Sequence, residues 1–298
     1  MMLRGYYKLL PASALVLSLI GFVIYSIDFN SSWSGLVGVV NGHSLKDEDG
    51  PVANGIPLRI MFLGASITRG EVSTGDRGYR KYLRDTLTTW GNPVNFVGFN
   101  RFGDWEDNDV EGYGAHRIRR IQPHAAQAVP VLQPNLILVQ VGTSDCFQKD
   151  DPDNIGLRMR QLIDTLLFTS PRATVIMSTL PTTPDPEVEL CVLSANAQIR
   201  QVAEDLKREE ERVVLAEMHH DQSLPGRPRP EDIGGDRIHP TDEGYIMMGK
   251  SFLEAIRVVE KKGFLKPPVE NGIPDDGNVG REVEDKLRDK AEAEHPIA

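Results

Sequence analysis

Five short apolar runs alternate with amphipathic stretches between residues 57 and 262. The runs cover residues 58–63, 94–98, 135–141, 173–179 and 212–216. Their length and weak alternation predict strands that are covered on both faces. The stretches between them repeat apolar residues at helical spacing, as at Tyr79, Leu83, Leu87 and Trp90. This alternation predicts a three-layer α/β/α fold of flavodoxin-like size, with a five-stranded parallel sheet.

The chain begins with a long apolar segment. Residues 9–27 carry no charge, and they follow Arg4 and Lys8 within the short segment 1–8. Nineteen predominantly apolar residues without a charge can span a bilayer as a helix, and the basic flank favours a cytoplasmic N-terminus. We therefore predict a single-pass transmembrane signal anchor that places the following domain outside the cytosol, in a lumenal or extracellular compartment. A cleaved signal peptide, which would leave a secreted protein, is the alternative.

Two further segments flank the predicted domain of residues 57–262. Residues 28–56 are rich in Ser, Gly and Asn, which predicts a linker between membrane and domain. Residues 263–298 begin with a Pro- and Gly-containing stretch and continue into a highly charged one with few apolar residues. We predict that they form a linker followed by a disordered tail.

Composition narrows the function classes only slightly. The chain of 298 residues is 40% apolar and 26% charged, with a formal net charge of −10. An acidic chain without a basic stripe argues against a nucleic-acid partner. The only cysteines, Cys146 and Cys191, lack the paired spacing of a structural zinc site, and we expect no metal. They form either a disulfide or two buried thiols, and the predicted compartment favours the disulfide.

Ser66 follows the first apolar run, after Gly64 and Ala65. These small residues allow a sharp turn at the carboxyl end of the predicted strand, where open α/β sheets bind their ligands. A serine at that place is a candidate nucleophile, although a serine after a strand is more often a helix N-cap. The interpretation therefore depends on what else the chain brings to Ser66.

Asp236 and His239 supply a candidate acid and base just before the last amphipathic stretch. Pro240 keeps His239 in extended geometry outside the helix, which Thr241 can cap. A carboxylate three residues before a histidine can turn back onto the imidazole and fix its tautomer. A surface salt bridge is the alternative interpretation of this pair.

With two Gly-containing segments added, the chain resembles the SGNH (GDSL-type) hydrolase superfamily over about residues 57–262. Gly64-Ala-Ser-Ile-Thr68 resembles the first family block, Glu111-Gly-Tyr-Gly-Ala115 the second, Gly142-Thr-Ser-Asp145 the third, and Asp236-Arg-Ile-His239-Pro240 the last. The Glu-Gly-Tyr and Asp-Cys contexts are most similar to acetylxylan-esterase-like domains of carbohydrate esterase family 3. The resemblance implies a Ser66–His239–Asp236 triad and no cofactor.

The resemblance also implies an oxyanion hole, and the chain departs from the family pattern there. The resemblance assigns donors to the backbone N–H groups of Ser66 and Ala115, next to Gly114. Ala115 stands where the family has glycine, and its N–H is retained if its φ is negative. Ser144 replaces the family asparagine, and its hydroxyl is shorter than an amide. Ala65 replaces the usual aspartate of the first block and leaves the triad untouched.

Two functions from different classes remain open on the sequence. The first is a serine esterase that hydrolyses small acyl esters, acetyl above all, on acylated carbohydrate. Within this class a lipid esterase or an O-acetyltransferase could use the same triad. The second is a weak or inactive surface protein that binds glycans on the same scaffold, which Ser144 and Ala115 favour. Both functions imply an ester or a glycan as the binding partner. In both, the predicted N-terminal helix contacts the membrane.

Overall fold

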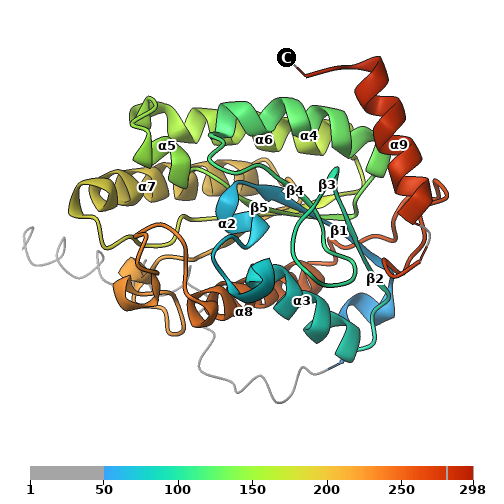
Figure 1. The fold of residues 1–298 in the computed structure, drawn as a ribbon, viewed down its shortest axis with the longest axis horizontal. Helices are drawn as coiled ribbons and strands as arrows, with labels where there is room; N and C mark the ends of the chain where they lie inside the picture. The colour runs from blue at the N-terminus through green and yellow to red at the C-terminus, as the bar shows by residue number, and fades with distance from the viewer. Residues whose placement is uncertain (1–49, 280, 298) are drawn as a thin grey trace, which may run out of the picture. The chain divides into compact units, whose positions relative to one another are not determined.

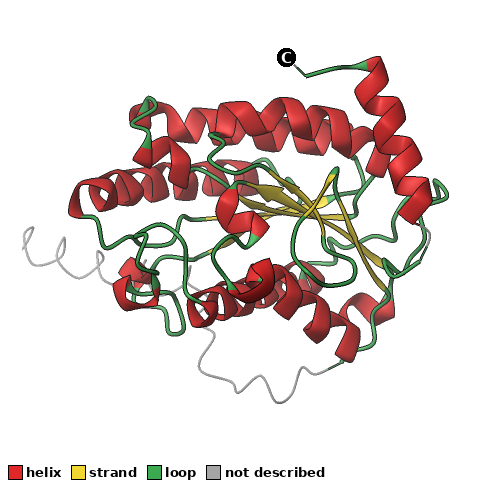
Figure 2. Cartoon of the chain, viewed as in Figure 1, coloured by secondary structure: helices red, strands yellow, loops and turns green. Residues whose placement is uncertain are grey.

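A seven-stranded sheet organises the residues that the computed structural model describes, which are 50–279 and 281–297 (Figures 1 and 2). The strands are β1 (Leu58–Gly64), β2 (Val94–Val97), β3 (Asn100–Arg101), β4 (Asp109–Gly112), β5 (Leu136–Gln140), β6 (Thr174–Ser178) and β7 (Val213–Ala216). Their order is β3-β4-β1-β5-β6-β7. Strand β2 pairs with residues 58–61 of β1, and β4 pairs with residues 63–64 of the same strand. Every pairing is parallel except that of β3 with β4.

Helices cover both faces of this sheet (Figure 1). The helices are α2 (Ser66–Arg69), α3 (Gly78–Thr89), α4 (Ile118–Leu132), α5 (Thr143–Phe147), α6 (Ile155–Thr169), α7 (Pro186–Arg208), α8 (Asp242–Lys261) and α9 (Arg281–Glu294). Short 3₁₀ turns lie at Val52–Gly55, Thr74–Asp76, Pro152–Asn154, His220–Gln222 and Pro230–Asp232. One apolar core joins the sheet to α4, α6 and α7, and a second joins its other face to α3 and α8. The three layers that the pattern predicts are therefore present.

The strand prediction was correct for five strands and incomplete for the sheet. The five apolar runs form β1, β2, β5, β6 and β7. Strands β3 and β4 extend the sheet to seven strands and make it mixed, so the prediction of a five-stranded, wholly parallel sheet was wrong. The apolar pattern did not predict strand β4, because this strand buries two acidic residues. Asp109 pairs with Arg101 and Arg281, at 3.0 and 2.8 Å, and Glu111 accepts the Tyr113 hydroxyl at 2.6 Å.

The domain begins slightly before residue 57. Val52 is fully buried, and its N–H donates to Asn92 Oδ1 at 2.8 Å, so the end of the predicted linker belongs to the domain. The apolar stretch 9–27, for which we predict a membrane-spanning helix, lies outside the described residues. Within residues 50–279 and 281–297, no helix combines the length and apolar character that crossing a bilayer requires.

Residues 263–279 and 281–297 pack against the domain, and residues 281–294 form the helix α9, which corrects the prediction of a linker and disordered tail. The buried guanidinium of Arg59 donates to the carbonyls of Val269 and Ile273, at 3.0 and 3.1 Å. Asn95 Nδ2 donates to Pro274 O and to Glu284 Oε1, at 2.7 and 3.0 Å. These bonds hold residues 263–279 along the sheet, and α9 packs against α4 (Figure 1). The segment also places Ile273 and Ala291 in the apolar core, with Val283 and Leu287 packed against it. The sequence looks disordered because these apolar residues are few and the polar bonds come from Arg59 and Asn95, far away in the chain.

Glu284 of α9 makes the stability of this C-terminal packing depend on pH. Its burial raises the pKa of the carboxyl to about 7, with Asp109 adding to the effect. Its Oε2 and the facing Asn95 Oδ1 are buried and have no hydrogen-bond partner among the described residues. A carboxyl whose pKa is raised by folding favours the folded state at low pH, and this contribution is lost as the pH rises from about 4.5 to about 7.

We therefore expect Glu284→Gln to raise the free energy of unfolding by about 1–3 kcal/mol at pH 8 and to change it little at pH 4.5. The amide carries no charge, and it can donate to the unpartnered Asn95 oxygen. Urea unfolding at the two pH values measures the difference. The exposed Glu282→Gln on the same helix is the control and should be neutral at both. Equal destabilisation by Glu284→Gln at both values would contradict this account.

Candidate active site

The turn after β1 places Ser66 at the carboxyl edge of the sheet. Gly64 ends the strand so close to β5 that a Cβ atom there would lie 2.0 Å from Gln140 O and 2.2 Å from Thr68 Oγ1. Only glycine fits this approach. Ser66 then begins the short helix α2, with 8% of its surface exposed. The predicted nucleophile is therefore at a buried strand end and still reaches a cavity.

Asp236 and His239 form the predicted pair on the loop before α8. Asp236 Oδ2 lies 2.6 Å from His239 Nδ1, and Oδ1 accepts the backbone N–H groups of Ile238 and His239, both at 3.0 Å. Partial burial alone would raise the pKa of the Asp236 carboxyl, but these hydrogen bonds hold it below its usual range. The loop is closed by Gly234 N–H on His239 O at 2.7 Å. The ring of His239 therefore has a fixed direction, and Asp236 is held as a carboxylate.

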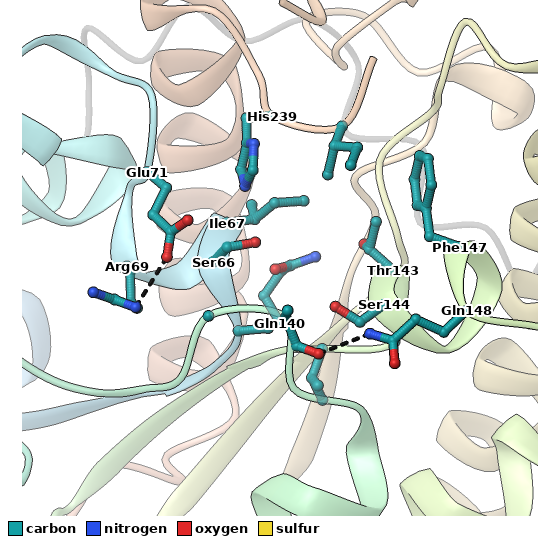
Figure 3. Close-up of a pocket in the computed structure, with 16 residues that line it drawn as sticks. Ser66, Ile67, Arg69, Glu71, Gln140, Thr143, Ser144, Phe147, Gln148 and His239 are labelled. Carbon is teal, nitrogen blue, oxygen red and sulfur yellow. Dashed lines mark hydrogen bonds and ion pairs between the residues drawn. The ribbon is translucent and has the colours of Figure 1, made fainter. Parts of the chain in front are cut away.

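A cavity of about 530 Å³ brings Ser66 and His239 together (Figure 3). Figure 3 shows the imidazole of His239 above the Ser66 side chain, with both directed into the same space. His239 Nε2 is buried and has no hydrogen-bond partner among the described residues. The other residues that line the cavity are Ala65, Ile67, Arg69, Glu71, Gly114, Ala115, Gln140, Val141, Gly142, Thr143, Ser144, Phe147, Gln148 and Ile238. A serine, a free imidazole nitrogen and a carboxylate behind the ring are the groups that nucleophilic acyl transfer requires.

The residues predicted to hold an oxyanion line the same cavity, but Ala115 differs from expectation. Its φ is +57°, in the left-handed region, whereas the glycine-to-alanine argument assumed a negative φ. Gln148 Nε2 donates to Ala115 O at 2.8 Å and helps to hold this conformation. Gly114 before it is tightly enclosed, since a Cβ would lie 2.9 Å from atoms of Arg69 and Glu71. Alanine is thus accommodated in a turn that favours glycine.

We expect Ala115→Gly to raise the free energy of unfolding by about 0.5–1 kcal/mol. Glycine relieves the strain of the left-handed conformation, and its greater freedom in the unfolded chain offsets only part of that stabilisation. Thermal unfolding measures the change. The same substitution at the exposed helical residue Ala126 of α4 should instead destabilise the protein by about 1 kcal/mol. Destabilisation at both positions would show that the turn does not favour glycine.

The Gly142–Asp145 segment opens α5 and presents Ser144 to the cavity. Cys146 of this helix forms a disulfide with Cys191 of α7, with 5.5 Å between the Cα atoms. Asp145 is fully buried, accepts the Ile118 N–H and pairs with Arg158, both at 3.1 Å. The disulfide and the buried carboxylate together fix α5 against α4, α6 and α7. The short helix that carries Ser144 is therefore rigidly positioned.

Two features of the cavity were not indicated by the sequence pattern. Arg69 and Glu71 form an ion pair of 3.0 Å at the cavity (Figure 3), and the Arg69 guanidinium lies 3.7 Å from the ring centre of Phe102. Gln140 lies at the end of β5, where a polar residue closing an apolar run was the only available signal. Within the part of the chain that the structure describes, no cluster of three His, Cys, Asp or Glu residues is placed to bind a metal ion.

The three-layer fold places a serine at the end of β1 and a histidine–aspartate pair at one cavity. The chain belongs to the GDSL-like lipase/acylhydrolase family, whose model matches residues 62–246. It is also 29% identical, over 241 residues, to a multidomain esterase of Ruminococcus flavefaciens. That match covers 70% of this chain and spans 29% of the length of the relative.

Solved structures similar to this fold include carbohydrate esterases. A family 3 carbohydrate esterase of Clostridium thermocellum is 22% identical with a TM-score of 0.60, covering 69% of this chain and 98% of that one. A family 3 carbohydrate esterase of Talaromyces cellulolyticus is 20% identical with a TM-score of 0.58, covering 68% and 99%. An acetylxylan esterase of Geobacillus stearothermophilus is 20% identical with a TM-score of 0.51, covering 68% and 95%. At these identities the likeness concerns the fold.

Proposed function

We propose that this protein is a serine esterase that removes small acyl groups, acetyl above all, from acylated carbohydrate. The observation that carries the proposal is the free Nε2 of His239 in the cavity of Ser66, with Asp236 bonded at 2.6 Å to the opposite ring nitrogen. The carbohydrate part is supported by the similar fold of family 3 carbohydrate esterases and an acetylxylan esterase.

In the proposed mechanism Ser66 Oγ attacks the ester carbonyl while His239 Nε2 accepts the hydroxyl proton. Asp236 stabilises the imidazolium that forms. The tetrahedral intermediate places its negative oxygen toward the backbone N–H of Ser66. It collapses with loss of the alcohol, which takes the proton from His239, and leaves an acyl group on Ser66. Water then attacks this acyl-enzyme with His239 again as base, and the carboxylic acid leaves.

Substrate class is tested by four assays on the same preparation. We expect release of acetate from acetylated xylan, and rates on 4-nitrophenyl esters that fall as the acyl chain lengthens. Preferred cleavage of lysophospholipid would instead indicate a lipid esterase, and transfer of acetyl to an added sugar in place of water would indicate an acetyltransferase. Either result would overturn the substrate proposal and leave the triad proposal intact.

A catalytically weak glycan-binding protein is the second candidate, and two observations favour it. The side chain of Ser144 carries no amide donor, and Ala115 is in a backbone conformation that glycine would adopt more readily. This function predicts binding of xylo-oligosaccharides without turnover. Titration calorimetry with the wild-type chain, run beside the acetate assay, separates the two candidates.

We further propose that the domain works outside the cytosol, anchored by residues 9–27. The disulfide between Cys146 and Cys191 supports an oxidising compartment, since such bonds are rare in the cytosol. Protease protection of the full-length chain in membrane vesicles tests this location. In vesicles whose cytoplasmic face is outward, we expect the domain to be degraded only after the membrane is permeabilised, and degradation in intact vesicles would contradict this location.

A further inference from the structure

Gln140 is the last residue of β5 and lies directly beside the nucleophile turn. In the parallel pairing of β1 with β5 it is the partner of Gly64, two residues before Ser66. Its side chain is 1% exposed and lines the floor of the cavity. A neutral amide buried this deeply at a strand end needs a reason, because buried amides almost always have hydrogen-bond partners.

The two ends of the Gln140 amide have different surroundings. Oε1 faces Thr68 Oγ1 at 3.5 Å, and the same hydroxyl donates to Gln140 O at 2.9 Å and accepts from Tyr79 OH at 3.1 Å. The single proton of the Thr68 hydroxyl goes to Gln140 O, so Oε1 only lies against this hydroxyl. Nε2 has no hydrogen-bond partner among the described residues. The donor end of the amide is therefore buried and free.

Figure 3 shows where this donor lies in the cavity. The Gln140 amide stands between Ser66 and the turn of Thr143 and Ser144. An ester whose carbonyl carbon is attacked by Ser66 would direct its oxygen into this space, away from His239. Ser144 occupies the position from which the family asparagine supplies an amide, so that position here offers only a hydroxyl.

We propose that Gln140 Nε2 is the side-chain donor of the oxyanion hole and replaces the amide that Ser144 lacks. This inference rests on the proposed esterase function. A buried donor without a partner gains one only when the oxygen of the substrate becomes negative and moves toward it. The interaction is then stronger in the transition state than in the bound substrate, so it raises kcat with little effect on KM.

The test compares three variants of the full chain, measured with 4-nitrophenyl acetate. Gln140→Ala removes the donor, Gln140→Glu keeps the shape with an acceptor in its place, and Gln140→Ala with Ser144→Asn restores a family-type amide. We expect each single variant to lower kcat by about 10²–10³-fold with KM nearly unchanged. We expect the double variant to recover at least about tenfold. Gln122→Ala on the outer helix α4 is the control and should keep the wild-type rate.

Each alternative outcome has a distinct signature. A Gln140→Ala rate within about twofold of wild type would overturn the proposal. A large loss that Ser144→Asn does not restore, with a shifted pH profile, would overturn it by making Gln140 a positioning residue of His239. A wild-type chain that hydrolyses no ester would instead remove the proposed function, and the role of Gln140 with it.

Discussion

We expect Ser66→Ala to lower the hydrolysis of 4-nitrophenyl acetate by about 10³–10⁶-fold, the loss that follows when a serine nucleophile is removed from a triad. The substitution deletes one oxygen from a residue that is 8% exposed, so the fold should be retained. Steady-state rates, with circular dichroism as evidence of folding, measure the effect.

The matched control for this prediction is Ser194→Ala, which removes an exposed hydroxyl from α7 and should leave the rate unchanged. A Ser66→Ala protein that is folded and hydrolyses the ester at the wild-type rate would exclude the covalent mechanism. The binding function would then be the better account of the cavity.

We expect Asp236→Asn to lower kcat by about 10³–10⁴-fold without unfolding the protein. Two backbone N–H groups, those of Ile238 and His239, donate to Asp236 Oδ1 at 3.0 Å. The amide oxygen of an asparagine would take that place, and its NH₂ group would then face His239 Nδ1. The ring would be forced to carry its proton on Nε2, which could no longer accept the proton of Ser66.

A second Asp–His pair in the same domain provides the control for Asp236→Asn. Asp221 Oδ1 lies 3.1 Å from His219 Nδ1, and neither residue lines the cavity. Asp221→Asn makes the same chemical change next to a histidine and should keep the rate within about twofold. Equal losses for both variants would indicate a general destabilisation rather than a tautomer effect.

The parts of the fold that the sequence predicted are those held by apolar contacts. Residues such as Ile60, Phe62 and Leu138 are fully buried in the sheet and form runs that are visible without a structure. Strand β4 and helix α9 were missed because they contribute few apolar residues to the core and are also held by ion pairs across the chain. Asp109 meets Arg281, 172 residues away, and no local pattern predicts such a partner.

The candidate site was also predicted only in part. Ser66, Asp236 and His239 were identified from local turn chemistry and family resemblance, and the structure brings Ser66 and His239 to one cavity with Asp236 behind the ring. The φ of Ala115 was not predictable, because the surrounding turn and Gln148 determine it. Gln140 was not predictable either, since the direction of its side chain follows from the register of β5 beside β1.

The central claim is that His239 activates Ser66 as a nucleophile, and covalent labelling tests it most directly. The protein is treated with a fluorophosphonate, digested, and examined by mass spectrometry, with the His239→Ala variant beside it. The account predicts one adduct, on Ser66, that forms rapidly in wild type and at least about 10³-fold more slowly in the variant. A folded wild-type protein without an adduct on Ser66, or with equal labelling rates in both proteins, would contradict it.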